Sequence, residues 1–254
     1  MRYSDVTDAL DVLGNVEKAA HLSRFFKTGP GQYGAGDRFI GVRVPEQRTV
    51  AKRFCSLPLK EIGKLLAAQI HEYRLTGLLI LVDQYSKAKD SDMRREVVDF
   101  YMTNLIRVNN WDLVDLSAPK ILGEHLLHNP EERNVLFSLI QSANLWERRV
   151  AVVATLPLIR QGQFGELLIL AKMSLTDSHD LMHKAVGWML REIGKTHLIV
   201  LEEFLGMYAG VMPRTMLRYA IELFEPERRQ YFMKGEDYLR EDIGLNSLGT
   251  EQHG

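Results

Sequence analysis

Residues 145–154, LWERRVAVVA, contain the pattern that decides the fold. A basic residue is followed there by small and apolar residues as Arg149-Val150-Ala151, and this order returns as Lys184-Ala185-Val186 and Arg218-Tyr219-Ala220. The basic residues are 35 residues apart (149 to 184) and then 34 residues apart (184 to 218). Recurrence at such intervals indicates internal repeats, each long enough to hold two helices.

The same register continues toward the N-terminus. Asp115 lies 34 residues before Arg149, and Arg74 lies 41 residues before Asp115. Similar intervals, of 35 and 42 residues, separate the three tryptophans, which are Trp111, Trp146 and Trp188. Two-helix repeats of roughly 35–45 residues are typical of HEAT-type solenoids. We therefore expect an all-α fold, a HEAT-like helical-repeat solenoid whose curved right-handed superhelix has a basic concave face.

Apolar residues recur at spacings of three and four along most of the chain, whereas strand-like alternation is scarce. We expect one HEAT-like repeat domain over residues 1–235 and a poorly ordered polar tail over residues 236–254. The run 29–36, GPGQYGAG, holds four glycines and a proline and predicts a loop. The expected helices cover residues 3–13, 15–27, 45–55, 58–69, 72–88, 91–107, 118–128, 130–142, 145–159, 163–174, 178–195, 197–209, 213–224 and 226–234.

The composition indicates a globular protein outside the membrane. Hydrophobic residues make up 46% and charged residues 26% of the 254 residues, and the apolar runs are far shorter than the ~20 residues of a membrane span. The first residues lack the apolar run of a signal peptide. The single cysteine, Cys55, excludes an intramolecular disulfide and a cysteine-rich zinc site. We expect a soluble, cytoplasmic protein of bacterial type, with no membrane partner and no bound metal.

The charges balance, since 32 basic and 33 acidic side chains give a formal net charge of −1. This balance argues against a strongly basic nucleic-acid-binding domain, but it says nothing about how the charges are distributed. Equivalent positions of stacked repeats line up along the inner wall, so we expect a basic stripe that binds DNA phosphates. Its candidate residues are Arg74, Arg149, Lys184 and Arg218, with Arg43, Arg48 and Arg148 beside them. The alternative is an ordinary solvated helix surface.

An acid within a basic groove repels phosphate, but it stabilises a positive charge. Breaking an N-glycosidic bond creates an oxocarbenium-like sugar, which a carboxylate such as Asp115 would stabilise. Trp111 lies four residues earlier, so the two side chains share one face if this turn is helical. The indole can then pack against a deoxyribose and offer its electron-rich face to a cation. Two structural explanations remain open: Asp115 caps a helix that begins near Ala118, or it pairs with Arg149.

Three blocks of sequence resemble the AlkD-like DNA alkylation repair family of HEAT-like repeat DNA glycosylases. They are residues 110–115 (NWDLVD), 145–151 (LWERRVA) and 184–192 (KAVGWMLRE). Residues 41–48 (GVRVPEQR) resemble the start of an early helix in that family, and the resemblance extends from about residue 20 to residue 232. It implies a monofunctional DNA glycosylase of base excision repair that hydrolyses the N-glycosidic bond without a metal or organic cofactor. Its implied substrates are cationic N3- and N7-alkylated purines, such as 3-methyladenine and 7-methylguanine, in duplex DNA.

The resemblance also implies residue roles. It places the catalytic carboxylate at Asp115, the sugar-packing indoles at Trp111 and Trp188, and the groove arginine at Arg149. The chain departs from the family at Phe25, where we align a tyrosine, and in the loop of residues 29–36, which looks longer. We expect a monomer that binds double-stranded DNA containing alkylated bases and is associated with the nucleoid when bound. The competing hypothesis is a non-catalytic HEAT-like module that binds DNA or a protein partner.

Overall fold

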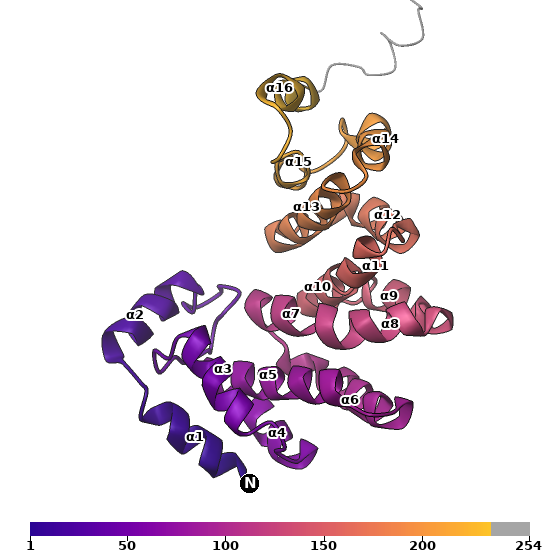
Figure 1. Cartoon of the computed structure of the whole chain (residues 1–254). Coiled ribbons are helices and arrows are strands. Elements are labelled where there is room, and N and C mark those ends of the chain that lie inside the picture. The colour runs from indigo at the N-terminus through magenta and orange to yellow at the C-terminus, as the bar shows by residue number, and fades with distance from the viewer. Residues whose placement is uncertain (235–254) are drawn as a thin grey trace, which may run out of the picture. The chain divides into compact units, whose positions relative to one another are not determined.

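The computed structural model describes residues 1–234, so the predicted tail over residues 236–254 lies outside the described residues. Throughout the described residues the regular elements are helices, and a single isolated β-bridge joins Arg38 to Ile70. The expectation of an all-α fold of helical repeats is confirmed (Figure 1). Within residues 1–234 no helix is both long and apolar enough to cross a membrane.

The chain divides into two compact units, Met1–Pro157 and a second unit that begins at Leu158. The prediction of one repeat domain stays a prediction. The first unit contains α1 (Tyr3–Asp11), α2 (Val16–Phe25), α3 (Val44–Arg53), α4 (Leu59–Leu66), α5 (His71–Lys87), α6 (Ser91–Thr103), η1 (Leu105–Arg107), α7 (Trp111–Ser117), η2 (Pro119–Gly123), α8 (Glu124–His128), η3 (Pro130–Glu132), α9 (Asn134–Leu139) and α10 (Leu145–Val153). After α11 (Leu156–Arg160), which crosses the division, the second unit contains α12 (Gly165–Met173), η4 (Ser174–Thr176), α13 (Asp180–Gly194), α14 (Leu198–Tyr208), α15 (Arg214–Ala220) and α16 (Pro226–Lys234).

Helix α5 forms the centre of the first unit. Its residues 71–81 are all buried, as expected of a helix that is enclosed on every side. It contacts α3, α4, α6 and α7, and Figure 1 shows it among these helices. The polar residues at its start, His71, Glu72 and Arg74, are therefore inside the protein, where each needs a partner.

In the second unit, α13 packs against α14 and α15. The contact with α15 is close at Gly187, where an added Cβ would lie 2.4 Å from the carbonyl oxygen of Met216. Glycine is required there because any larger residue would push the two helices apart. Leu190 and Leu217 are buried in this unit and contribute to its core.

The main departure from the expected helices concerns residues 111–128. We expect a helix over 118–128, but α7 already begins at Trp111, because the Asn110 side chain accepts a hydrogen bond from the Trp111 N–H. The chain then stays helical through Pro119 by widening to a π turn, in which the Gly123 N–H donates to the Ala118 carbonyl at 2.9 Å. A second departure is the break between α10 and α11, just before Pro157, whose ring disrupts a continuous helix.

Candidate functional site

Helix α7 carries two of the predicted site residues, Trp111 and Asp115, one helical turn apart. Asp115 lies inside this helix, so the explanation that it caps a helix near Ala118 is wrong. The other explanation, pairing with Arg149, is confirmed. Arg149 comes from α10, which contacts α7, and the guanidinium therefore approaches Asp115 from a neighbouring helix.

The ion pair between Asp115 and Arg149 has two contact points. Arg149 Nε donates to Asp115 Oδ1 at 2.9 Å, and Nη2 donates to Oδ2 at 2.8 Å. The Arg149 side chain is 6% exposed and that of Asp115 is 18% exposed, so the carboxylate is the member that solvent reaches. Burial raises the pKa of Asp115, the charge of Arg149 opposes this rise, and nearby Asp112 adds to it. The pair thus holds a poorly solvated carboxylate in a fixed orientation.

The Trp111 indole rests on aromatic side chains from the end of α2. Its ring stacks on Phe26 with centroids 5.2 Å apart and an interplanar angle of 18°, and Phe25 meets it edge-on at 6.0 Å. Its Nε1 donates to the hydroxyl of Tyr33 at 3.3 Å. Tyr33 comes from the glycine-rich loop, and the sequence interpretation did not include it. The indole is half-buried, and these contacts fix its plane.

A buried ion cluster lies beside α7 and consists of Asp37, His71, Arg74 and Asp112. The His71 ring bonds to Asp112 Oδ2 through Nε2 at 2.8 Å and to Asp37 Oδ2 through Nδ1 at 3.1 Å. Arg74 Nη2 lies 2.7 Å from Asp37 Oδ1. Burial lowers the pKa of His71, but the charge and hydrogen bond of Asp112, with the bond to Asp37, raise that pKa to about 9. The imidazole is therefore a cation at neutral pH, shared by two carboxylates.

The predicted DNA contact of Arg74 is not supported by this position. Its side chain is only 5% exposed, and Nη1 donates to the carbonyl oxygens of Ala68 and Gln69. Because these groups and Asp37 surround the guanidinium, Arg74 neutralises a buried acid instead of facing solvent. The repeat intervals place Arg74 at an equivalent position of a repeat helix, but they do not predict that its side chain is buried.

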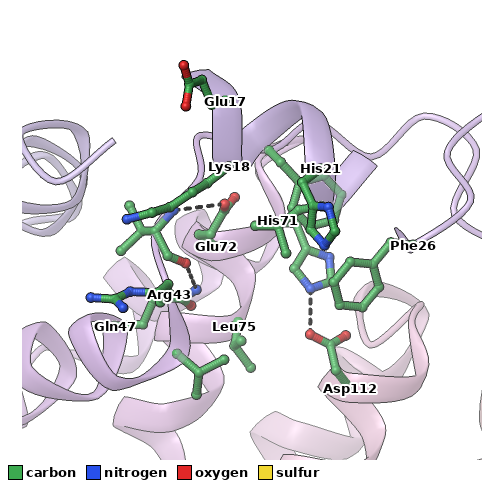
Figure 2. A pocket seen from close by; sticks show the side chains of 14 residues that line it. Glu17, Lys18, His21, Phe26, Arg43, Gln47, His71, Glu72, Leu75 and Asp112 are labelled. Carbon is green, nitrogen blue, oxygen red and sulfur yellow. Dashed lines mark hydrogen bonds and ion pairs between the residues drawn. The ribbon is translucent and has the colours of Figure 1, made fainter. Parts of the chain in front are cut away.

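Phe26 also lines a cavity of about 410 Å³. Figure 2 shows this cavity with Phe26, His71 and Asp112 on one side and Gln47 and Leu75 on the other. Two polar side chains of this cavity bond to the backbone: Glu72 accepts from the N–H groups of residues 40–42, and Gln47 donates to the carbonyl of residue 42. Glu17, Lys18 and His21 also line the cavity. Most of the cavity wall is nevertheless apolar, with Leu22, Phe26, Phe39 and Leu75 among its residues.

The other predicted cations of the first unit have different surroundings. Arg48 on α3 and Arg43, directly before α3, are both exposed. Arg43 pairs with Glu46 at 2.9 Å. Arg148 is half-buried and donates to the carbonyls of Ser142 and Ala143. The exposed positions of Arg43 and Arg48 are compatible with phosphate contacts.

The remaining predicted residues belong to the second unit. Lys184 and Trp188 lie one turn apart on α13. Lys184 pairs with Asp180 at 2.7 Å, and Trp188 is half-buried and donates through Nε1 to Glu192 at 3.0 Å. Arg218 is exposed on α15. The structure thus brings Trp111, Asp115 and Arg149 together within the first unit.

Comparison with known proteins gives a family match and a structural match. A family model described as DNA alkylation repair enzyme matches residues 6–224. A solved structure described as a predicted DNA alkylation repair enzyme from Enterococcus faecalis is similar to this chain, with a TM-score of 0.66 and 20% sequence identity, over 84% of this chain and 97% of that chain. At this identity the likeness concerns the fold. No curated protein matches the chain significantly.

Proposed function

Because the chain belongs to the DNA alkylation repair enzyme family, we propose that it is a DNA glycosylase that removes cationic N3- and N7-alkylated purines from duplex DNA. Family membership supports a role in DNA repair and DNA as the substrate. The reaction and the lesions, 3-methyladenine and 7-methylguanine among them, are the proposal. The observation that carries it is the partly exposed carboxylate of Asp115, oriented by Arg149 one helical turn from Trp111.

The reaction breaks the bond between C1′ of the deoxyribose and the purine nitrogen. The bonding electron pair leaves with the base, which loses its positive charge, and the sugar becomes an oxocarbenium-like cation. A cationic base leaves without being protonated, so the enzyme needs to stabilise the sugar more than it needs a general acid. Asp115 supplies the negative charge beside C1′. It also orients the attacking water and takes its proton as the new C1′–O bond forms.

The neighbours of Asp115 have supporting roles. Trp111 packs its indole against the deoxyribose, and the electron-rich ring face adds to the stabilisation of the cation. Arg149 keeps the carboxylate ionised and oriented and, in the complex, lies beside the phosphate next to the lesion. We assign phosphate contacts also to Arg43, Arg48, Arg148, Lys184 and Arg218, and a second sugar contact to Trp188. A cytoplasmic monomer that joins the nucleoid when bound to DNA is part of the same proposal.

A non-catalytic DNA-binding module is the second candidate. One observation favours it: the ion pair between Asp115 and Arg149 would hold α7 against α10 even if no reaction took place. The same pair suits a catalytic carboxylate, so the two functions have to be separated by measurement.

The test is the release of 7-methylguanine from methylated duplex DNA by the native protein and by Asp115→Asn. This change keeps the shape of the side chain and removes its charge. Asp99→Asn is the matched control, because Asp99 is exposed on α6. We expect Asp115→Asn to lower the rate at least a hundredfold, roughly the cost of removing one electrostatic stabiliser. The melting temperature also falls, because the buried Arg149 loses its charged partner. Rates and DNA affinity are therefore compared well below the unfolding transition of the variant, where DNA affinity stays near native.

Release by the native protein, lost in Asp115→Asn and retained in Asp99→Asn, supports the glycosylase. If the native protein binds DNA and releases no base, the binding module is the better description. Equal release by all three proteins would leave the activity in place and remove Asp115 from the mechanism.

A further inference from the structure

The glycine-rich loop of residues 29–36 lies over the Trp111 side of the candidate site. Tyr33, at its middle, accepts a hydrogen bond from Trp111 Nε1 at 3.3 Å. The Tyr33 ring also meets the ring of Trp146 edge-on, with centroids 6.1 Å apart. This loop, whose sequence predicts no role, thus places a phenol against the indole that the proposed function assigns to the sugar.

The residues that flank this loop on both sides bond to the rest of the first unit. At its start, the N–H and the hydroxyl of Thr28 both donate to the Ser23 carbonyl at 3.2 Å. At its end, Asp37 belongs to the buried ion cluster, and Asn110 Nδ2 donates to Asp37 Oδ2 at 3.3 Å. Since Asn110 also caps α7, the end of the loop and the helix with Trp111 and Asp115 share one anchor.

The backbone between these anchors folds tightly. The Gln32 N–H donates to the Gly29 carbonyl and the Asp37 N–H to the Gly34 carbonyl, at 3.1 and 3.0 Å. Gly34 passes so close to the chain that an added Cβ would lie 2.4 Å from the Phe26 carbonyl oxygen. The position of Tyr33 is therefore determined by the fold and not by its side chain alone.

The Tyr33 hydroxyl donates only a long hydrogen bond in this structure, so it can donate to a stronger acceptor. A phenol has one donor proton and can accept as well. The acceptor side is taken by Trp111, and the proton is directed at the Phe25 carbonyl at 3.5 Å, which is at the outer limit of a hydrogen bond. A phosphate oxygen carries negative charge and accepts a much stronger bond. The loop residues 29–36 have no charged side chain, so nothing in that segment repels a phosphate.

We propose that Tyr33 is a DNA-contacting residue of this site, which donates its hydroxyl proton to a phosphate oxygen beside the nucleotide that Trp111 contacts. The inference rests on the proposed function, because it takes DNA as the ligand of α7. In the complex the Tyr33 hydroxyl donates its hydrogen bond to the phosphate instead of the Phe25 carbonyl, and it still accepts the hydrogen bond from Trp111 Nε1. The loop then fixes the Trp111 indole and one phosphate with the same hydroxyl.

The test combines Tyr33→Phe with a change in the DNA. Binding is measured on a duplex with a tetrahydrofuran abasic-site analogue, first with a normal backbone and then with single neutral methylphosphonates at each phosphate within a few positions of the analogue. Tyr33→Phe keeps the ring beside Trp146 and loses only the hydroxyl. Tyr3→Phe is the matched control, because Tyr3 lies on α1 and packs against Tyr73.

We expect Tyr33→Phe to weaken binding of the normal duplex about tenfold or more, the size of a lost hydrogen bond to a charged group. One methylphosphonate position should lower the affinity of the native protein for the duplex by a similar factor. At that same position the affinity of Tyr33→Phe should not fall any further. Because a phenol displaces no counterion, the salt dependence of binding stays native, whereas a lost cation would reduce its slope. Tyr3→Phe should bind every duplex like the native protein.

The two proposals fail in different ways. If the native protein releases methylated bases but Tyr33→Phe binds every duplex as tightly as native, the role of Tyr33 is overturned and the glycosylase stands. If the fold-loss in DNA affinity caused by Tyr33→Phe is the same with and without a methylphosphonate at every position, Tyr33 does not contact a phosphate. If no base is released but one position shows the coupling, the glycosylase is overturned and the contact stands.

Discussion

Asp115 on α7 and Arg149 on α10 are 34 residues apart in the chain and form an ion pair with two N–O contacts, at 2.9 and 2.8 Å. The separation is the repeat length found in the sequence. Equivalent positions of successive repeats therefore meet across adjacent helices, and here one position holds an acid and the next a base. The carboxylate is the more exposed of the two, which makes it available to a ligand without separating the pair.

Removing Arg149 should change the pH dependence of the reaction. Burial raises the pKa of Asp115 and the Arg149 charge opposes it, so Arg149→Gln leaves the rise unopposed. Asp115 acts as an anion, and activity falls as the pH drops through its pKa. We expect this fall to begin at higher pH in the variant, as measured by base release across acidic and neutral pH. Arg148→Gln is the control and should keep the native profile. An unshifted profile in Arg149→Gln would show that Asp115 does not limit the rate.

Arg74 and Arg48 should respond differently to substitution. Arg74→Met leaves Asp37 without its guanidinium partner inside the protein, which we expect to cost about 3 kcal/mol of unfolding free energy. Arg48→Ala, on the exposed side of α3, should leave stability unchanged, weaken DNA binding and reduce the salt slope by about one. Urea unfolding and DNA titrations at several salt concentrations measure both. If Arg74→Met were as stable as the native protein but bound DNA weakly, Arg74 would be a DNA contact after all.

His71 should make stability depend on pH on the alkaline side. Its pKa rises from 6.5 in the unfolded chain to about 9 in the folded protein, so its contribution is complete below pH 6.5 and is lost as the pH rises to about 9. The difference corresponds to about 3 kcal/mol. Urea midpoints from pH 6 to pH 9.5 should show the decline in the native protein and in His21→Gln, whose site is exposed. His71→Gln should be less stable at neutral pH and lack the decline; a decline of native size in that variant would assign it to another group.

Gly34→Ala should displace the glycine-rich loop. The new Cβ would lie 2.4 Å from the Phe26 carbonyl oxygen, so the backbone must move away and carry Tyr33 off Trp111. We expect a loss of about 1–3 kcal/mol in unfolding free energy and slower base release. Gly29→Ala is the control, since its Cβ would approach only the flexible side chain of Gln32. Native release by Gly34→Ala would mean that the position of the loop does not affect the site.

Local spacing was enough to predict much of this protein. Apolar periodicity predicted the helices, and the interval of 34 residues predicted that Asp115 and Arg149 occupy equivalent positions. The four-residue step from Trp111 to Asp115 predicted a shared face on the condition that the segment is helical, and α7 fulfils that condition. The start of α7 was missed because its capping residue, Asn110, resembles a loop residue when read without its partner.

Tertiary packing decided what spacing could not. Asp37, His71 and Asp112 are 34 and 41 residues apart, which matches the repeat intervals. The intervals do not show that these side chains are buried or that they pair, since this follows from the packing of α5 against α7 and the glycine-rich loop. The same packing buries Arg74 and sets Tyr33 against Trp111. The sequence by itself determined which residues lie on which helix face. The tertiary structure determined how deeply each side chain is buried and which charge it meets, because these depend on contacts between segments far apart in the chain.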